Sequence, residues 1–158
     1  MKILEFFDSI IGCFNKHNVK YLLVGGHAVN LYGHIRSTAD LDLWIDKSED
    51  NLSKLYNALV SFGYDQNTCL KGIEEIKQNR NIGLFDDENN KVDVIQLYST
   101  KLKFQEAYSR KKSVKKGDVT LHVISLEDLI DTKIASGRPR DLEDVKELIK
   151  LRGLREDR

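Results

Sequence analysis

Two aspartates separated by one residue are the feature of this sequence best suited to chemistry. Asp40 and Asp42 stand in the run Ala39–Asp46, where apolar residues take the alternate positions. Because side chains alternate along a strand, a strand over 39–46 predicts that both carboxylates share one face. Neighbouring carboxylates repel one another unless a cation lies between them. Hard oxygen ligands of this kind suit Mg²⁺ (or Mn²⁺), so the spacing predicts a divalent-metal site.

A third acid stands inside a later apolar run. Asp93 lies between Val92 and Val94, where a carboxylate is costly unless it is paired or bound to a metal. Two interpretations are open for it: a salt bridge with a nearby Lys or Arg, and a ligand of the same metal. For Asp40 and Asp42 the alternative is a half-exposed strand with solvated acids. Aspartate is disfavoured inside strands, so two within three residues favour the metal.

Two glycines follow the short apolar run over 21–24. Gly25 and Gly26 lead into an apolar helical turn, with His27 as its first side chain. Glycine lets the backbone approach a ligand closely, and the N–H groups at a helix start point toward an anion. We therefore expect a phosphate cradle here. His27 either contacts a phosphate or covers the cradle.

Further candidates for phosphate binding lie outside the glycine turn. Arg36, Ser37 and Thr38 precede the acidic run and are either turn residues or donors to phosphate oxygens. Lys133 follows Leu129 and Ile130 at helical spacing and therefore shares their apolar face. A lysine at such a position either extends outward to solvent or reaches a buried phosphate.

Together these residues resemble the nucleotidyltransferase superfamily related to DNA polymerase beta. The family motif is an apolar residue with Gly and then Gly or Ser, a spacer, an Asp–apolar–Asp–apolar run, and a later acid between apolar residues. The matching segments are Val24-Gly25-Gly26, Asp40-Leu41-Asp42-Leu43 and Val92-Asp93-Val94. Residues 133–144 resemble the tail of small bacterial members, the minimal nucleotidyltransferases and abortive-infection toxins.

The resemblance implies the nucleotidyltransferase fold, which is an α/β (α+β) fold with a mixed β-sheet flanked by helices and with C-terminal helices. It implies an enzyme that transfers a nucleoside monophosphate from a nucleoside triphosphate, such as ATP, to a hydroxyl acceptor by a two-metal mechanism. Asp40, Asp42 and Asp93 would hold the metal ions, and Lys133 would neutralise charge that builds toward pyrophosphate. The nucleotide-binding residues would be Gly25, Gly26, His27, Arg36, Ser37, Thr38 and Lys133.

The resemblance also implies a range of acceptors and cellular roles. Small bacterial members modify tRNA, a partner protein or an antibiotic, and some belong to toxin–antitoxin or phage-defence systems. The alternative is a non-catalytic, antitoxin-like module that keeps the fold and binds a nucleotide or a partner. Retention of all three acids favours the enzyme, whereas the small size favours the module. A basic cluster is either a solvated hairpin edge or an RNA contact: Arg110, Lys111, Lys112, Lys115 and Lys116.

Length and composition narrow these possibilities. At 158 residues, the chain predicts a single domain over 1–158, with a core at about 19–124 and a helical part at about 125–154. Lys plus Arg and Asp plus Glu each number 25, so no global attraction to nucleic acid is expected. Cys13 and Cys69 stand apart, as reduced thiols of a cytoplasmic protein do. No apolar stretch approaches the length that spans a membrane.

The remaining pattern predicts the elements that position these residues. Helices are expected over 2–17, after Gly26 to about Gly33, from Ser48 to Gly63, around Phe104 and Ala107, from Ser125 to about Ala135, and after Pro139. Strands are expected over 21–24, 39–46, 82–85 and 92–98, with a hairpin over 114–123. Residues 64–79 predict a loop with a short helix.

Overall fold

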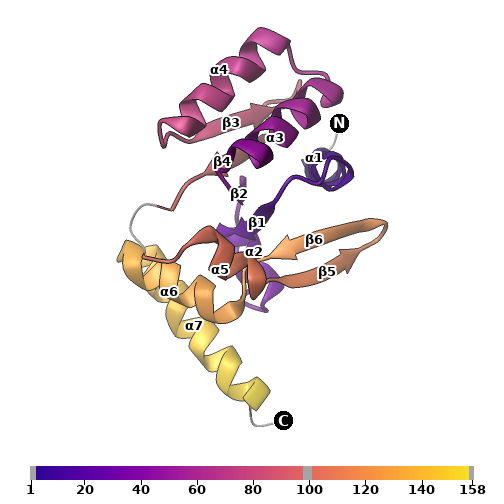
Figure 1. Ribbon diagram of the computed structural model, residues 1–158. Coiled ribbons are helices and arrows are strands. Elements are labelled where there is room, and N and C mark those ends of the chain that lie inside the picture. Colours follow the sequence, from indigo (N-terminus) through magenta and orange to yellow (C-terminus); the bar gives the residue numbers. More distant parts are fainter. Residues whose placement is uncertain (1–2, 98–100, 157–158) are drawn as a thin grey trace.

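A mixed β-sheet organises the molecule, as the sequence predicts. The computed structural model describes residues 3–97 and 101–156, and six strands of this part form one sheet in the order β3-β4-β2-β1-β6-β5 (Figure 1). The strands are β1 (Tyr21–Val24), β2 (Leu41–Ile45), β3 (Ile82–Phe85), β4 (Lys91–Ile95), β5 (Lys112–Lys116) and β6 (Val119–Val123). The α/β fold class is confirmed.

The strand pairing brings distant parts of the sequence together at the centre of the sheet. β2 runs parallel to β4 and antiparallel to β1, and β1 runs parallel to β6. The outer strands β3 and β5 pair antiparallel with β4 and β6. β1 lies between β2 and β6, and each of its residues is buried. A continuous apolar run suits a strand that is covered in this way.

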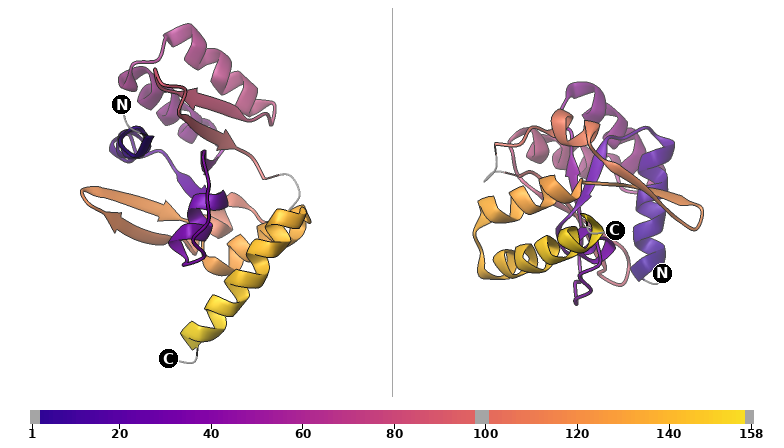
Figure 2. Two further views of the ribbon diagram at one scale, coloured as in Figure 1. Left: turned by 180° about the vertical axis from the view of Figure 1, so that it is seen from behind. Right: turned by 90° about the horizontal axis from the view of Figure 1, so that it is seen from below.

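The described helices cover the sheet from several sides. They are α1 (Ile3–Lys16), α2 (Gly25–Leu31), α3 (Glu49–Phe62), α4 (Gln66–Lys77), α5 (Phe104–Ser109), α6 (Leu126–Ser136) and α7 (Pro139–Glu156). In Figures 1 and 2, α3 and α4 lie beside β3 and β4, and α6 and α7 form a pair at the opposite end of the molecule. None of the described helices is long and apolar enough to cross a membrane.

Local signals in the sequence set the ends of two important helices. The side chain of Ser48 accepts a hydrogen bond from the Asn51 N–H at the start of α3, and Gly63, with φ of 122°, ends that helix. Ser125 caps α6 in the same way, and Gly137 ends it in the left-handed region. Both boundaries agree with the capping residues that the sequence predicts.

The largest difference from the sequence-based expectation is α4. Residues 66–77 form a 12-residue helix where a loop with a short helix was expected. Asp65 caps its start, and its buried residues Cys69, Ile73 and Ile76 recur at helical spacing. Only three residues of α4 are buried, so the hydrophobic periodicity of this segment was too weak to predict a long helix. The expectation of strand up to Tyr98 and of helix from Lys2 partly falls outside the described residues.

Candidate active site

The centre of the site is a pair of carboxylates on adjacent strands. In the parallel register of β2 and β4, Asp42 pairs with Asp93. Both side chains are half-buried and lie on the same face of the sheet. Leu41 and Leu43 alternate with Asp42 and are buried, and so are Val92 and Val94 on either side of Asp93. The apolar neighbours therefore anchor each strand while the two acids face one space.

Asp40 lies outside the strand on which it was predicted. β2 begins at Leu41, and Asp40 lies in an exposed bend before it. The reason is the end of the strand ladder: Val24 of β1 pairs with Asp42, and the chain beyond Val24 turns into α2. Residue 40 therefore has no strand partner on β1. The expectation of a strand over 39–46 with both acids on one strand face was wrong, although Asp40 still lines the same cleft as Asp42.

The carboxylates crowd one another in a partly dry environment. Burial, and then the negative charges of Asp93 and Asp40, raise the pKa of Asp42 to about 6. The positive charge of Lys133 opposes this shift. A carboxyl group that holds its proton to such a pH is short of positive charge. The position therefore favours a bound cation.

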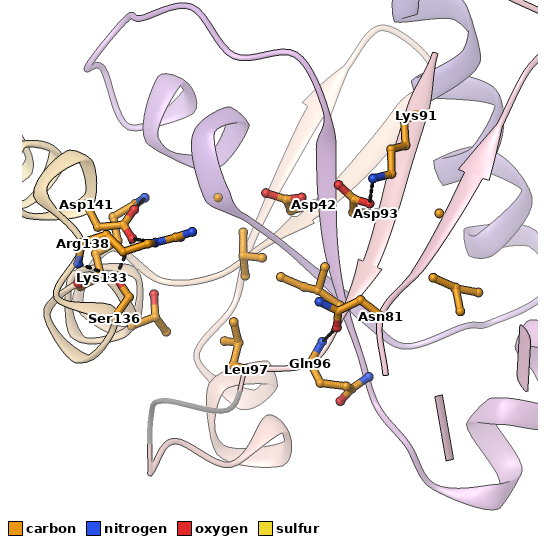
Figure 3. Close-up of a pocket in the computed structure, with 16 residues that line it drawn as sticks. Asp42, Asn81, Lys91, Asp93, Gln96, Leu97, Lys133, Ser136, Arg138 and Asp141 are labelled. Atoms are coloured by element: carbon orange, nitrogen blue, oxygen red, sulfur yellow. Dashed lines mark hydrogen bonds and ion pairs between the residues drawn. The ribbon is translucent and has the colours of Figure 1, made fainter. Parts of the chain in front are cut away.

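Two neighbouring cavities with shared lining residues open over these acids. The larger has a volume of about 750 Å³ and the smaller about 470 Å³. Both are lined by Gly25, Asp42, Asp93, Lys133, Arg138 and Asp141. Figure 3 shows Asp42 and Asp93 side by side on the strands, with Lys133, Arg138 and Asp141 facing them from the helices. The cleft thus has an acidic floor and a mixed, partly cationic wall.

Lys133 does not extend outward to solvent, and it lines both cavities over the acids. Its side chain is buried, and its Nζ lies 2.9 Å from Asp141 Oδ1 and 3.0 Å from Asp144 Oδ2. Burial alone would raise the pKa of Asp141, yet hydrogen bonds from Ser136, Lys133 and Arg138 hold it at about 2. Lys133 therefore reaches the cleft as part of an ion-pair network.

The same network binds the loop in front of β2. Arg36 donates from Nε and Nη2 to the two oxygens of Asp144, each at 2.8 Å. This fork geometry is the strong form of an arginine–carboxylate pair. Arg36 is therefore held by α7, and its guanidinium faces the smaller cavity while engaged with Asp144.

Gly25 and Gly26 leave no room for a side chain, because neighbouring residues approach their backbone closely. Gly25 has φ of 71°, and a Cβ placed on it would overlap Asp42 Oδ2. A Cβ on Gly26 would overlap Thr38 Oγ1, and it would lie 3.2 Å from Arg36 Nη1. No side chain caps the start of α2. The glycines thus let the turn meet both an acid of the site and the loop before β2.

The other predicted phosphate contacts divide into two groups. Thr38 lines the smaller cavity, together with Arg138 and Arg140. Ser37 is exposed, and its carbonyl accepts hydrogen bonds from Arg36 and Arg140. Ser37 is absent from the lining of both cavities, so the structure does not bring its hydroxyl to the site.

His27 lines neither of the two cavities over Asp42 and Asp93. Its ring packs edge-on against Phe7 at 5.4 Å, and it lines a separate apolar cavity of about 280 Å³ between α1 and the sheet. Burial lowers the pKa of His27. Neither a phosphate contact nor a cover over the cradle fits this position, because α2 directs His27 to the side opposite Asp42.

One site residue was missed by the sequence reasoning. Lys91 Nζ lies 2.9 Å from Asp93 Oδ1 and lines the larger cavity. The salt bridge considered for Asp93 is therefore present. The signal was available, because Lys91 and Asp93 are two residues apart on a strand and must share a face. Within residues 3–97 and 101–156, no three His, Cys, Asp or Glu side chains gather closely enough to form a ready metal site.

The basic cluster near the hairpin lies apart from this cleft. Arg110 Nε lies 2.9 Å from Asp128 Oδ2. Lys116 Nζ lies 3.3 Å from Asp8 Oδ1. Lys111 lies over the ring of Tyr108 at 4.1 Å. These contacts fit the expectation of a solvated hairpin edge, and none of the cluster lines either cavity over the acids.

Comparison with known proteins identifies the family. The sequence profile described as "Nucleotidyltransferase of unknown function (DUF6036)" matches residues 2–152. The chain belongs to this family. Among curated proteins, none matches the sequence significantly.

Solved nucleotidyltransferases share the fold. A lincosamide antibiotic adenylyltransferase, LnuA, solved with lincomycin bound, superposes with a TM-score of 0.57 at 20% identity. The match covers 94% of this chain and 96% of that one. An antigenic nucleotidyltransferase-like protein from Paracoccidioides brasiliensis gives a TM-score of 0.55 at 16% identity, over 96% of this chain and 76% of that one. The nucleotidyltransferase fold expected from the motif is confirmed.

Proposed function

We propose that this protein transfers a nucleoside monophosphate from a nucleoside triphosphate to a hydroxyl group, and that it requires a divalent cation. The observation that carries the proposal is the pairing of Asp42 with Asp93 on the floor of a cleft whose wall carries Lys133 and Arg138. Membership of a nucleotidyltransferase family supports it.

The residues at this position fit a divalent cation. Asp42 and Asp93 present oxygen ligands, and Asp40 lines the smaller cavity beside them. The raised pKa of Asp42, caused by burial and by the two other acids, indicates that added positive charge is favourable there. Mg²⁺ or Mn²⁺ held by these acids would neutralise phosphate charge and polarise the reacting phosphoryl group.

The smaller cavity suits the triphosphate. Arg36, Lys133, Arg138 and Arg140 contribute positive charge to its lining, and Gly25 and Gly26 place backbone there without a side chain. Positioning and electrostatic stabilisation account for most catalysis of phosphoryl transfer. Lys133 and Arg138, held by Asp141, would therefore face the charge that develops on the departing pyrophosphate.

The larger cavity suits the acceptor. Beyond the carboxylates it is lined by Asn81, Ile82, Ile95 and Leu97, a mixture of amide and apolar groups. The acceptor oxygen would form a bond to the α-phosphorus as the bond from the α-phosphorus to the bridging oxygen breaks. Pyrophosphate then leaves, and Asp93 accepts the hydroxyl proton. The acceptor would be tRNA, a partner protein or a small molecule, and a macromolecular acceptor would fit a toxin–antitoxin or phage-defence role.

The test is direct transfer of label. The protein is incubated with each α-³²P-labelled nucleoside triphosphate, Mg²⁺ and one acceptor source at a time: total tRNA, cell lysate protein or hydroxyl-bearing antibiotics. ATP comes first, because the structural relative LnuA is an adenylyltransferase. Label on an acceptor with the native chain, and none with Asp42→Asn, is the expected result. The absence of transfer with every combination would contradict the proposal.

A second candidate is a non-catalytic module that binds a nucleotide or a partner. The observation that favours it is the ion pair between Lys91 and Asp93, which occupies one of the expected metal ligands. Such a module would bind a nucleoside triphosphate with the same affinity in the presence and absence of Mg²⁺, and it would transfer no label. The two candidates therefore give opposite results in one assay.

A further inference from the structure

Lys91 is positioned as a cation within the acidic centre. Its Nζ lies 2.9 Å from Asp93 Oδ1, and the side chain is about one-third exposed. Its partner is the carboxylate that pairs with Asp42 across β2 and β4. Figure 3 shows the Lys91 side chain reaching Asp93 from the same strand, with the Asp42 carboxylate on the other side of Asp93.

The neighbouring strand provides the space that the lysine occupies. Gly83 of β3 pairs with Asp93, and Phe85 pairs with Lys91. A Cβ on Gly83 would lie 2.9 Å from Lys91 Cε and 3.0 Å from Phe85 Cε2. The Lys91 Nζ also lies 5.9 Å from the centre of the Phe85 ring, within range of a weak cation–π interaction. Because residue 83 is a glycine, the Lys91 side chain has room to pass over it toward Asp93. The Phe85 ring lies on the other side of the lysine and helps to keep it there.

The charges at this centre favour one divalent ion over two. Asp40, Asp42 and Asp93 carry three formal negative charges, and Lys91 neutralises one of them. Before a nucleotide binds, one divalent cation therefore matches the remaining charge of minus two, and the charge of the triphosphate would face the cationic side chains of the smaller cavity. A second divalent ion would need the Lys91 ammonium to leave Asp93, because like charges at such short range repel strongly. Lys133 cannot replace Lys91 there, since its Nζ lies between Asp141 and Asp144.

We propose that Lys91 takes the place of a second metal ion, so that this site binds a single divalent cation with its nucleotide. This inference rests on the proposed function and refines it, because it assigns to Asp93 a fixed ammonium partner in place of a second exchangeable metal. The ammonium group stays beside the acid that faces the acceptor cavity. Its charge is thus supplied by the chain and does not depend on the metal concentration.

The experiment counts bound Mn²⁺ per chain by equilibrium dialysis, with an ATP analogue in which a methylene group joins the α- and β-phosphates. The native chain is expected to bind one ion. Lys91→Met keeps most of the length of the side chain, removes its charge and is expected to bind two. Lys91→Arg restores a charge and should return the count to one. Lys116→Met, which breaks the remote pair with Asp8, is the matched control and should also bind one.

The outcomes distinguish failure of the role proposed for Lys91 from failure of the proposed nucleotidyl transfer. Two ions on the native chain would overturn the role of Lys91 and leave nucleotidyl transfer intact. One ion on both the native chain and Lys91→Met would also overturn it, because no second site would have been released. No ion on the native chain, combined with no label transfer, would contradict the proposed function itself. Thermal unfolding of each variant confirms that the counts refer to folded protein.

Discussion

Asp42 and Asp93 are cross-strand neighbours in the one parallel pair that joins β2 to β4. In parallel strands the two side chains project from the same face at the same level, so both carboxylates stay on that face whichever rotamer each adopts. The burial of Leu43 and Val94 on the opposite face fixes this register. The repulsion between the acids is therefore built into the fold, and it has measurable consequences.

The first prediction concerns stability without metal. The pKa of Asp42 is about 6 in the folded chain, above its ordinary value of 3.8. The folded state therefore binds this proton more tightly, and the stability contributed by Asp42 falls as pH rises from about 4 to 6. Two pKa units correspond to about 3 kcal/mol as an upper estimate. Asp42→Asn should raise the free energy of unfolding in EDTA, and by more at pH 8 than at pH 5. Urea unfolding at both pH values measures this, and an equal gain at both would show that ionisation of Asp42 is not the cause.

The second prediction concerns metal-dependent nucleotide binding. Asp42→Ala and Asp93→Ala should each remove the increase in nucleoside triphosphate affinity that Mg²⁺ or Mn²⁺ produces, because each deletes an oxygen ligand. Isothermal titration calorimetry with and without metal measures the effect. Asp50→Ala removes an acid from the exposed start of α3 and serves as the control. If Asp42→Ala binds as the native chain does under both conditions, the acids do not hold a metal.

The third prediction concerns the counter-ions of Lys133. Replacing Lys133 by Met leaves Asp141 and Asp144 buried without this partner, so we expect a loss of about 3–5 kcal/mol of stability. Asp141→Asn in the same chain should recover part of that loss, because it removes one of the unpaired charges. Urea unfolding of both single variants and of the double variant gives the coupling free energy between Lys133 and Asp141. A double variant that shows the sum of the two losses would refute the pairing.

Where Lys133→Ala remains folded, it tests the role of the lysine in binding. We expect its affinity for a nucleoside triphosphate to fall more than its affinity for the monophosphate, since Lys133 would face the outer phosphates. The comparison uses both ligands on one preparation. Equal losses would assign Lys133 to structure alone.

The fourth prediction concerns Gly26. Its close approach to Thr38 means that Gly26→Val should displace the loop before β2 and abolish nucleotide binding. The positive φ belongs to Gly25, so strain at residue 26 comes from contact and not from backbone conformation. In Gly26→Ala, the added replacement Thr38→Gly should restore the melting temperature but not the affinity, because Thr38 lines the cavity proposed to hold the triphosphate. Full recovery of affinity would show that the glycine is only structural.

The sequence predicted the parts of the site that depend on local pattern. The order Gly25-Gly26, Asp42, Asp93 is visible in the chain, and alternation within each strand correctly set the faces of Asp42 and Asp93. The position of Asp40 failed because the end of a strand depends on its partner, and β1 gives way to α2 at that level. The partners of Lys133 also could not be read locally, since Asp144 comes from another helix.

Lys91 is a different kind of omission. Its spacing from Asp93 was visible, yet the contact depends on Gly83 across the strand pair, and that register is a property of the sheet. His27 shows the opposite problem. It follows the glycine turn directly in sequence, but one step along α2 carries its side chain to the other side of the sheet.

The link between Arg36 and Asp144 has a consequence for the order of folding. These residues are 108 positions apart, so their pairing is among the most distant contacts of the chain. The sheet needs only residues up to Val123, whereas the loop that carries Arg36 and Thr38 is held by α7. During synthesis the carboxylates can therefore come together before the side of the cleft that carries Arg36 and Thr38 is complete. Contacts of long sequence separation are slow to form. The folding of α7 thus sets when the side of the cleft proposed to hold the triphosphate is complete.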